Sequence, residues 1–395
     1  MLYNRGMSTI EKKTKTESWE KAQKRKARFW RTWRPFAAWL MRLVYGYRTE
    51  SFTPPGQPYL LYANHVTDLD PVLVACTFPE QMAFVAGENV QRMGVLSGII
   101  RRYGNIVERV KGTTDSAAAM QILRTLKSGL PVCMFAEGNR SFAGKTGYIH
   151  PAAAKLARMA KVPLITYRLE GGYLTTPRWA THLRKGRMHG AVVHVYPFEE
   201  LRAMTNEQVQ AVIDRDLYVD AYAAEPIAYR GRKLAERLET MLYDCPKCHG
   251  IDTVTSRNDT VTCTCGMTLR MNRFGRFEGE SLPFAHPGEW DEWQSEWMKM
   301  HHDGLSFADA DMTLERLDTE THSVNEVAHG TMTFSKEGFA VGDFSVPFAK
   351  LEGMALVQRD KLVFSAERQN YTVRAKKPYC ARKYCDLYRL YKEEG

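Results

Sequence analysis

One histidine and one aspartate stand at a spacing suited to acid–base chemistry. His65 and Asp70 are separated by four residues and directly follow the apolar run 59–63. An imidazole titrates near neutrality and can take a proton from a hydroxyl, while a carboxylate on its other nitrogen fixes the tautomer. The same spacing recurs at His286 and Asp291 in a tryptophan-rich helical stretch. Only the first pair follows a buried strand, where loops carry chemistry, so we expect the chemistry there.

A second polar segment, 137–141, follows the apolar run 131–136 and contains Glu137, Gly138 and Arg140. Glycine allows a ligand to approach the backbone closely, and a guanidinium offers two parallel donors to a phosphate. This pattern favours an anion-binding loop. The alternative is an ordinary ion pair between Glu137 and Arg140 at the end of a strand.

The elements that must position these residues alternate between strand and helix up to about residue 242. Apolar runs predict strands over 59–63, 83–85, 131–136, 162–167 and 191–196, and helical periodicity predicts helices over 117–126 and 152–160. Strands alternating with helices indicate an α/β domain with a mostly parallel sheet. Both polar segments then lie at strand ends.

The two segments resemble motifs of the glycerolipid acyltransferase family, and more narrowly of the 1-acyl-glycerol-3-phosphate acyltransferases. N-H-V-T-D-L-D at 64–70 matches that family's N-H-x4-D, and F-A-E-G-N-R-S at 135–141 matches its F-P-E-G-T-R-S. I-V-E-R at 106–109 matches the end of its second motif, and V-P-L-I at 162–165 matches part of a later one. The resemblance covers residues 50–215. The chain departs from the family pattern at Gly104, Ala136, Asn139 and Thr166.

The resemblance implies transfer of a fatty acyl group from acyl-CoA or acyl carrier protein to the hydroxyl of a lysophospholipid, first of all 1-acyl-sn-glycerol-3-phosphate. His65 is the expected general base and Asp70 its support. No nucleophilic Ser or Cys neighbours His65 in its motif, so we expect direct attack without an acyl-enzyme and without a catalytic metal. The family holds the acceptor phosphate on residues matching Arg109, Glu137, Gly138 and Arg140. Glu137 cannot bind phosphate itself, so we expect it to orient an arginine or the loop.

The acceptor stays open between two kinds of lipid. Thr166, where the family has a proline, and the additional C-terminal modules motivate another lysolipid or a lipid-linked hydroxyl as the alternative acceptor.

Four cysteines form a separate pattern after the α/β region. Cys245, Cys248, Cys263 and Cys265 give C-x2-C-x14-C-x-C. Two close pairs at this distance are typical of a tetrahedral zinc site on a ribbon, and four protein ligands leave no open position, so the zinc would be structural. Eight cysteines in 395 residues are too few for a disulfide-stapled secreted scaffold. Four unrelated thiols are the alternative.

Positive charge is concentrated near the N-terminus. The formal net charge is +10, and residues 11–48 hold twelve Lys/Arg against three Glu. An apolar stripe at helical spacing runs through the same stretch and consists of Trp30, Trp33, Ala37, Leu40 and Val44. Pro35 is expected to kink this helix or to begin a second one. We therefore predict that residues 1–48 form a basic amphipathic arm on an anionic membrane surface, with packing on its own domain as the alternative.

Domain boundaries are expected at 49–242 for the acyltransferase domain, 243–280 for the zinc ribbon and 281–395 for a β-rich C-terminal domain. Short alternating segments are expected over 328–334, 339–341, 354–357, 361–365 and 371–375, and a closing helix over 379–391. In order and length they resemble a pleckstrin-homology-type barrel. The sequence lacks an apolar stretch long enough for a transmembrane helix and an apolar leader, so a peripheral place on the cytoplasmic side of a membrane is expected.

Two other classes of function compete with the enzyme. A nucleic-acid-binding protein would use the basic arm and the ribbon, but it leaves the two strand-end motifs unexplained, so we expect no nucleic-acid partner. A catalytically inactive membrane adaptor predicts the loss of His65 or Asp70, and the sequence has both.

Overall fold

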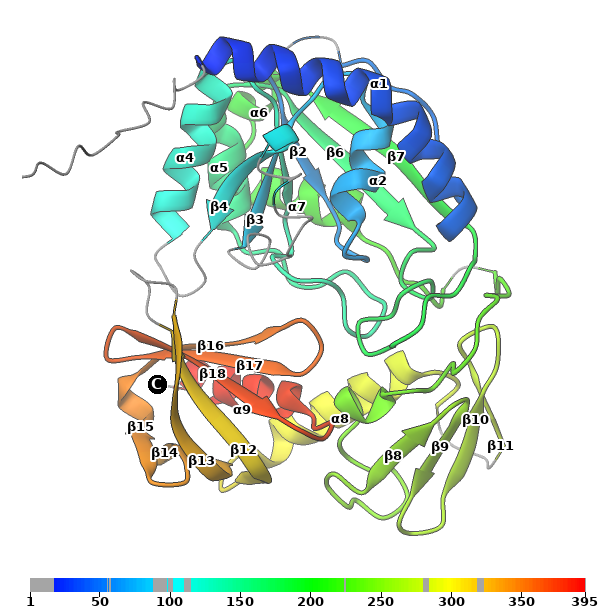
Figure 1. The fold of residues 1–395 in the computed structure, drawn as a ribbon, viewed down its shortest axis with the longest axis vertical. Helices are drawn as coiled ribbons and strands as arrows, with labels where there is room; N and C mark the ends of the chain where they lie inside the picture. Colours follow the sequence, from blue (N-terminus) through cyan, green and yellow to red (C-terminus); the bar gives the residue numbers. More distant parts are fainter. Residues whose placement is uncertain are drawn as a thin grey trace, which may run out of the picture.

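The computed structural model describes residues 18–54, 56, 58–87, 98, 102–109, 115–223, 225–279, 284–317 and 323–394. Over these residues the chain forms three sheets, which we call the N-terminal sheet, the ribbon sheet and the C-terminal sheet. Figure 1 shows the N-terminal sheet with its helices above the two smaller modules. The predicted combination of an α/β region with a largely β C-terminal region is confirmed.

The N-terminal sheet has the strand order β1-β7-β6-β2-β5-β3-β4. Its strands are β1 (Tyr47–Thr49), β2 (Leu60–Ala63), β3 (Ala83–Gly87), β4 (Asn105–Arg109), β5 (Val132–Phe135), β6 (Leu164–Glu170) and β7 (Met188–Tyr196). Strand β2 pairs in parallel with β5 and β6, and β7 runs antiparallel to β6. The carboxyl ends of β2 and β5 therefore lie side by side, and the two polar segments follow these ends.

Helices cover both faces of this sheet. They are α2 (Asp70–Thr77), α4 (Asp115–Lys127), α5 (Ala152–Ala160), α6 (Phe198–Ala203) and α7 (Asn206–Leu217). Side chains of a strand alternate between faces. Leu60 and Tyr62 accordingly pack with α4, α5 and α7, whereas Leu61 and Ala63 pack with α2 and with the N-terminal helix α1 (Trp19–Tyr45). Strand β2 is buried on both faces, as expected of a central parallel strand.

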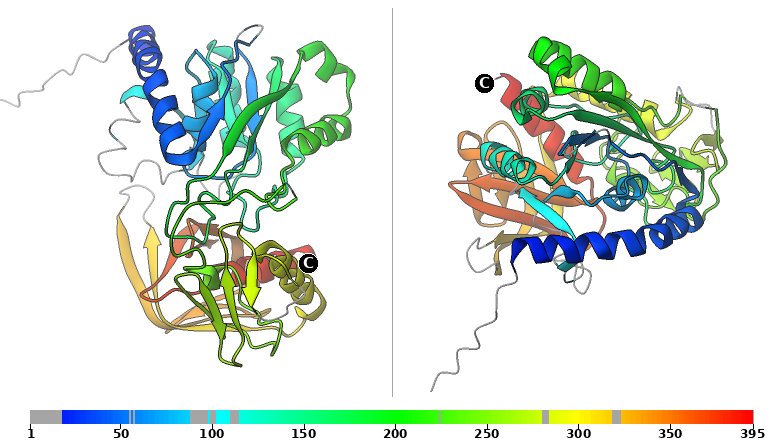
Figure 2. Two further views of the ribbon diagram at one scale, coloured as in Figure 1. Left: turned by 90° about the vertical axis from the view of Figure 1, so that its right-hand side faces the viewer. Right: turned by 90° about the horizontal axis from the view of Figure 1, so that it is seen from above.

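Helix α1 (Trp19–Tyr45) continues through Pro35 as one helix and lies along one side of the N-terminal sheet domain (Figure 2). Most of the predicted apolar stripe packs against the core of this domain, namely Trp30, Ala37, Leu40 and Val44. The interpretation of that stripe as a membrane-facing surface is therefore wrong for all but Trp33. A second apolar set on α1 is exposed instead and consists of Trp33, Phe36, Trp39 and Leu43. Among the described residues no helix is both long and apolar enough to cross a membrane.

The ribbon sheet is antiparallel, and its strand order β11-β10-β9-β8 follows the chain. Its strands are β8 (Val254–Arg257), β9 (Thr260–Cys263), β10 (Thr268–Met271) and β11 (Phe277–Gly279), preceded by the turn η2 (Leu238–Thr240). Helix α8 (Pro287–His301) follows, and its fully buried Trp290 packs into the ribbon core.

The C-terminal sheet is antiparallel, with the strand order β15-β14-β13-β12-β18-β17-β16. Its elements are β12 (Phe307–Leu317), β13 (Val324–Phe334), β14 (Gly338–Val341), β15 (Phe344–Pro347), η3 (Phe348–Lys350), β16 (Leu351–Val357), β17 (Lys361–Ala366), β18 (Gln369–Ala375) and α9 (Ala381–Glu394). Five of these strands and α9 lie on the segments and the closing helix expected from the sequence, whereas β12 and β15 do not. The likeness to a pleckstrin-homology-type barrel stays a prediction.

Candidate active site

His65 and Asp70 form a hydrogen-bonded pair at the carboxyl end of β2. Nδ1 of His65 lies 2.8 Å from Oδ2 of Asp70, which is fully buried at the start of α2. The Asp70 carboxylate also accepts hydrogen bonds from the backbone N–H of Val66 at 2.6 Å and from the hydroxyl of Thr67 at 2.6 Å. These donors fix the carboxylate. The imidazole is 21% exposed. Because Nδ1 is paired with Asp70, Nε2 is the nitrogen that can take a proton from a hydroxyl.

Neighbouring strands set the orientation of the histidine. The side chain of Asn64 donates to the backbone carbonyl of Leu169 in β6 at 2.9 Å and accepts from the N–H of the same residue at 2.7 Å. The His65 ring stacks on Phe135 of β5, with ring centroids 4.5 Å apart. Elements on both sides of β2 therefore hold the loop and the ring.

Glu137 connects the second polar segment to the first. Its carboxylate accepts hydrogen bonds from the backbone N–H of His65 and of Gly147, each at 2.6 Å. Burial raises the pKa of Glu137 to about 7, although the two backbone donors oppose that rise. Of the two roles expected for this residue, the geometry fits holding the loop backbone.

Arg140 reaches back to the first loop. Its guanidinium pairs with Asp68 at 2.6 Å and donates to the backbone carbonyl of Thr176 at 3.3 Å. The alternative, an ion pair between Glu137 and Arg140, is therefore wrong, because the partner of Arg140 is Asp68. Gly138 adopts a φ of 69°, which a glycine tolerates at little cost, and this turn carries the chain from β5 to Arg140. The side chain of Asp68 is 84% exposed. An anionic ligand could therefore reach the Arg140 guanidinium at the place where Asp68 binds it.

Tyr45 brings the end of α1 into the electrostatic field of this site. It is buried, and burial raises its pKa, with further contributions from the negative charges of Asp70 and Asp68, while Arg140 lowers it. The arm predicted over residues 1–48 as a separate element therefore ends, in α1, beside the candidate site.

Sequence reasoning missed Ser141. Its backbone N–H donates to the carbonyl of His65 at 3.0 Å, and its hydroxyl donates to the carbonyl of Lys145 at 2.6 Å while accepting from the N–H of Gly144 at 3.0 Å. The available signal was its place as the last residue of the F-A-E-G-N-R-S segment. Ser141 closes the loop and ties it to the histidine.

Arg109 and Thr166 stand apart from these residues. Arg109 ends β4, three strands from β2 in the sheet, so their backbones are about 14 Å apart. Nothing is described of its side chain, and its phosphate-binding role stays a prediction. Thr166 is buried in β6, and its hydroxyl donates to Asp216 of α7 at 2.8 Å. This departure from the family pattern therefore serves packing between sheet and helix.

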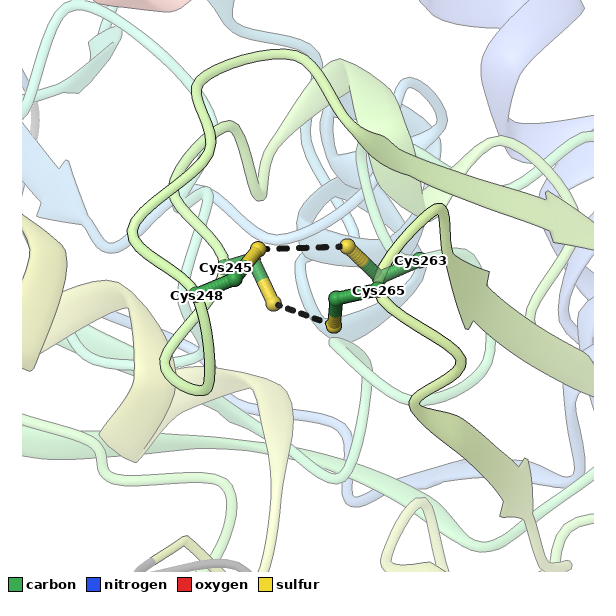
Figure 3. A group of neighbouring side chains, drawn as sticks. All are labelled: Cys245, Cys248, Cys263 and Cys265. Carbon is green, nitrogen blue, oxygen red and sulfur yellow. Dashed lines mark hydrogen bonds between the residues drawn. The ribbon is translucent and has the colours of Figure 1, made fainter.

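The four predicted cysteines converge, as Figure 3 shows. All four Sγ atoms lie within 4.8 Å of one another. The distance from Cys245 to Cys265 is 3.9 Å and that from Cys248 to Cys263 is 3.7 Å. A tetrahedron with metal–sulfur bonds of ~2.3 Å has sulfur–sulfur edges of ~3.8 Å, so this donor set fits one four-coordinate metal ion.

Comparison with known proteins identifies the N-terminal part of the chain. The acyltransferase family model matches residues 45–170. A protein of Mycoplasma genitalium described as "Probable 1-acyl-sn-glycerol-3-phosphate acyltransferase" is 28% identical over 123 residues, which cover 30% of this chain and 46% of that protein. The match thus spans about half the length of the curated relative.

Among solved structures, the 1-acyl-sn-glycerophosphate (LPA) acyltransferase PlsC from Thermotoga maritima is 20% identical, with a TM-score of 0.38, and the match covers 51% of this chain and 83% of that one. The family match includes β2, β5 and both polar segments. Over residues 45–170, the chain therefore carries a domain of the acyltransferase family.

Proposed function

We propose that the chain transfers a fatty acyl group from an acyl thioester to the free hydroxyl of a lysophospholipid. The observation that carries the proposal is the 2.8 Å pair of His65 and Asp70, with the guanidinium of Arg140 anchored on the same loop through Asp68. A base and an anion-binding group then face one acceptor, which is what acylating a phosphorylated glycerol requires.

In the proposed reaction the acceptor hydroxyl gives its proton to Nε2 of His65 while its oxygen attacks the thioester carbonyl carbon. The imidazolium that forms is stabilised by Asp70 through Nδ1. When the carbon–sulfur bond breaks, the leaving thiolate takes the proton from His65. The histidine is thereby regenerated without an acyl-enzyme.

The proposed acceptor is 1-acyl-sn-glycerol-3-phosphate, which would give phosphatidic acid. Its phosphate would take the place of Asp68 on Arg140, because a phosphate offers a guanidinium two oxygens and more charge than a carboxylate. The curated relative's description supports this acceptor. Acyl-CoA and acyl carrier protein remain equal candidates for the donor. Another lysolipid is the second acceptor candidate, now resting on the additional C-terminal modules, since Thr166 faces α7.

The experiment is a panel of lysophospholipids incubated with the purified full-length protein and labelled acyl-CoA or acyl carrier protein. Lysophosphatidic acid is expected to be acylated fastest. Product with a different lysolipid only would replace the acceptor, and no product with any lysolipid and either donor would overturn the enzyme proposal.

We also propose that the exposed face of α1 rests on an anionic membrane at the cytoplasmic side. Exposed aromatic and aliphatic side chains occupy α1 from Trp33 to Leu43. Exposed cations precede them along the helix, with one more near its end; they are Lys21, Lys24, Arg28, Arg31 and Arg42. Rings at the acyl boundary and cations at the headgroups suit an interfacial helix. The opposite face of α1 is covered by the domain core, so the helix would attach the whole domain.

The cysteine cluster is proposed to hold one structural zinc ion. Four thiolates satisfy a tetrahedral zinc completely, and the ribbon sheet is too small to be stable through its own core alone. In this role the metal ties the Cys245–Cys248 turn to the β9–β10 turn and takes no part in the acyl transfer.

A further inference from the structure

Arg178 joins the C-terminal sheet to the loop that carries Arg140. It lies between β6 and β7 and is 9% exposed. Its Nε donates at 2.7 Å to the carbonyl of Gln358 in the β16–β17 turn, and its Nη2 donates at 3.0 Å to the carbonyl of Leu356 near the end of β16. Its Nη1 donates to the carbonyl of Arg140 at 3.2 Å. One buried guanidinium thus holds two modules that are far apart in the sequence.

Phe142 strengthens the same connection. The guanidinium of Arg178 lies 4.6 Å from the centroid of the Phe142 ring, and that of Arg382 in α9 lies 5.2 Å from it. The carbonyl of Phe142 accepts a hydrogen bond from the hydroxyl of Tyr173 at 2.7 Å. The segment 140–142 is therefore held by arginines from two modules and is fixed at its backbone.

This segment contacts the candidate active site directly. The N–H of Ser141 donates to the carbonyl of His65, and the Arg140 side chain pairs with Asp68. A continuous series of hydrogen bonds therefore runs from the β16–β17 turn through Arg178 to the histidine loop.

We propose that Arg178 is a positioning residue through which the C-terminal sheet sets the place of Arg140 and of the histidine loop. The proposal rests on the proposed function, since it concerns how Arg140 meets the acceptor phosphate. The guanidinium is planar and presents its donors in a fixed geometry, so a shift of the β16–β17 turn is passed on to the Arg140 carbonyl. The C-terminal sheet is thereby part of the acceptor site without contacting the acceptor.

A purely structural role for Arg178 is the alternative, and Arg359 provides the matched control. Arg359 lies at the same turn and donates to the carbonyl of Ala180, across the same interface as Arg178. This hydrogen bond joins the modules but does not hold the segment 140–142. Removing Arg359 therefore weakens the interface, whereas removing Arg178 also releases the loop.

The first measurement is amide hydrogen exchange in the full-length variants Arg178→Met, Arg178→Lys and Arg359→Met. The Ser141 amide donates to the carbonyl of His65 and the Gly144 amide to the hydroxyl of Ser141, so their exchange reports on the order of this loop and on its contact with the histidine loop. We expect exchange there to become about tenfold faster in Arg178→Met, less so in Arg178→Lys, and to stay unchanged in Arg359→Met. Unchanged exchange in Arg178→Met, or equal acceleration in Arg359→Met, would overturn the proposal.

The second measurement separates binding from turnover. With lysophosphatidic acid as acceptor, we expect Arg178→Met to raise the acceptor KM about tenfold and to leave the acyl-donor KM unchanged. An unchanged acceptor KM in this variant contradicts the proposal. If the wild-type protein acylates no lysolipid, the proposed function fails, while the exchange measurement still decides the role of Arg178. If Arg178→Met does not fold, Arg178→Lys decides both readouts.

Discussion

The cysteine cluster and the candidate active site are assembled in opposite ways. The cluster takes its four side chains from two neighbouring turns within residues 245–265 of one small module. The candidate active site takes its groups from the ends of β2 and β5, and its loop is tied to β6 and the C-terminal sheet. When the residues of a site are close in the chain, their spacing in the sequence predicts that they meet. When they are far apart in the chain, the site depends on how the modules pack together. The four predictions below test this difference.

Removal of the metal should have the largest effect, and that effect should be local. A structural zinc contributes about 10–16 kcal/mol of binding free energy at neutral pH, which is folding free energy for the ribbon. We expect freshly purified protein to carry about one zinc per chain. The Cys263→Ser variant should lose the zinc and become protease-sensitive within the ribbon, measured by elemental analysis and limited proteolysis. Cys385→Ser, away from the cluster, should keep it, and full zinc content in Cys263→Ser would contradict the assignment.

Removal of the base should have the next largest effect and should leave folding intact. His65→Ala is expected to lower acylation about 10³-fold, the middle of the range for general-base catalysis. The measurement is kcat with lysophosphatidic acid, together with a thermal unfolding curve.

The matched control for His65 is His329→Ala, which removes an exposed histidine lying 3.1 Å from Asp311 on the C-terminal sheet. Its activity should equal that of the wild type. A His65→Ala variant with a near-wild-type rate would reject the base assignment.

Glu137 should make stability depend on pH through the contact between the two loops. Burial raises the pKa of Glu137 from 4.5 to about 7, so the folded protein binds this proton more tightly than the unfolded chain. The resulting stabilisation is present in full below about pH 4.5 and is lost as the pH rises through about 7, up to ~3 kcal/mol in total. The unfolding free energy of the wild type, relative to Glu137→Gln, should therefore fall between pH 5 and pH 8.

The same substitution tests the geometry of Glu137. A glutamine can accept from only one of the two backbone N–H groups and turns its amide toward the other, so we expect lower acylation at pH 8. A stability difference that stays constant with pH would show that this carboxyl is not buried as described.

The smallest effect concerns α1, where the sequence and the structure select different faces. Deleting the arm would uncover the domain core, so the sharper variant is Trp33→Ser/Phe36→Ser/Trp39→Ser, which changes exposed rings only. Partial insertion of these rings contributes about 2 kcal/mol, so binding to anionic vesicles should fall at least tenfold in co-sedimentation.

Phe274→Ser on the ribbon is the control, and it should bind the vesicles as the wild type does. Added salt should weaken the vesicle binding of the wild type and of Phe274→Ser without abolishing it, because lysine and arginine side chains supply part of the attraction. Equal binding by the triple variant would place membrane attachment elsewhere.

The C-terminal sheet shows where sequence patterns stop being informative. Strand β12 was not predicted because its inward side chains change phase. Phe307 is buried, but a register shift between Asp309 and Met312 turns Met312 and Leu314 inward, which breaks the two-residue alternation. Strand β15, four residues long, was missed as well.

The sequence by itself determined the features that are local in the chain. These are the strands that precede the two polar segments, the pairing of His65 with Asp70, and the convergence of the four cysteines. In each case the partners lie on one loop or on adjacent turns, so their spacing constrains their distance.

Only the tertiary structure decided what lies between distant segments. It selected which face of α1 is covered, gave Glu137 the backbone of His65 as its partner, and placed Arg178 between Arg140 and the C-terminal sheet. A helix with apolar side chains on two faces has no periodicity that tells the buried face from the exposed one. A backbone carbonyl is present at every residue, so no pattern of side chains can predict to which carbonyl an arginine will donate.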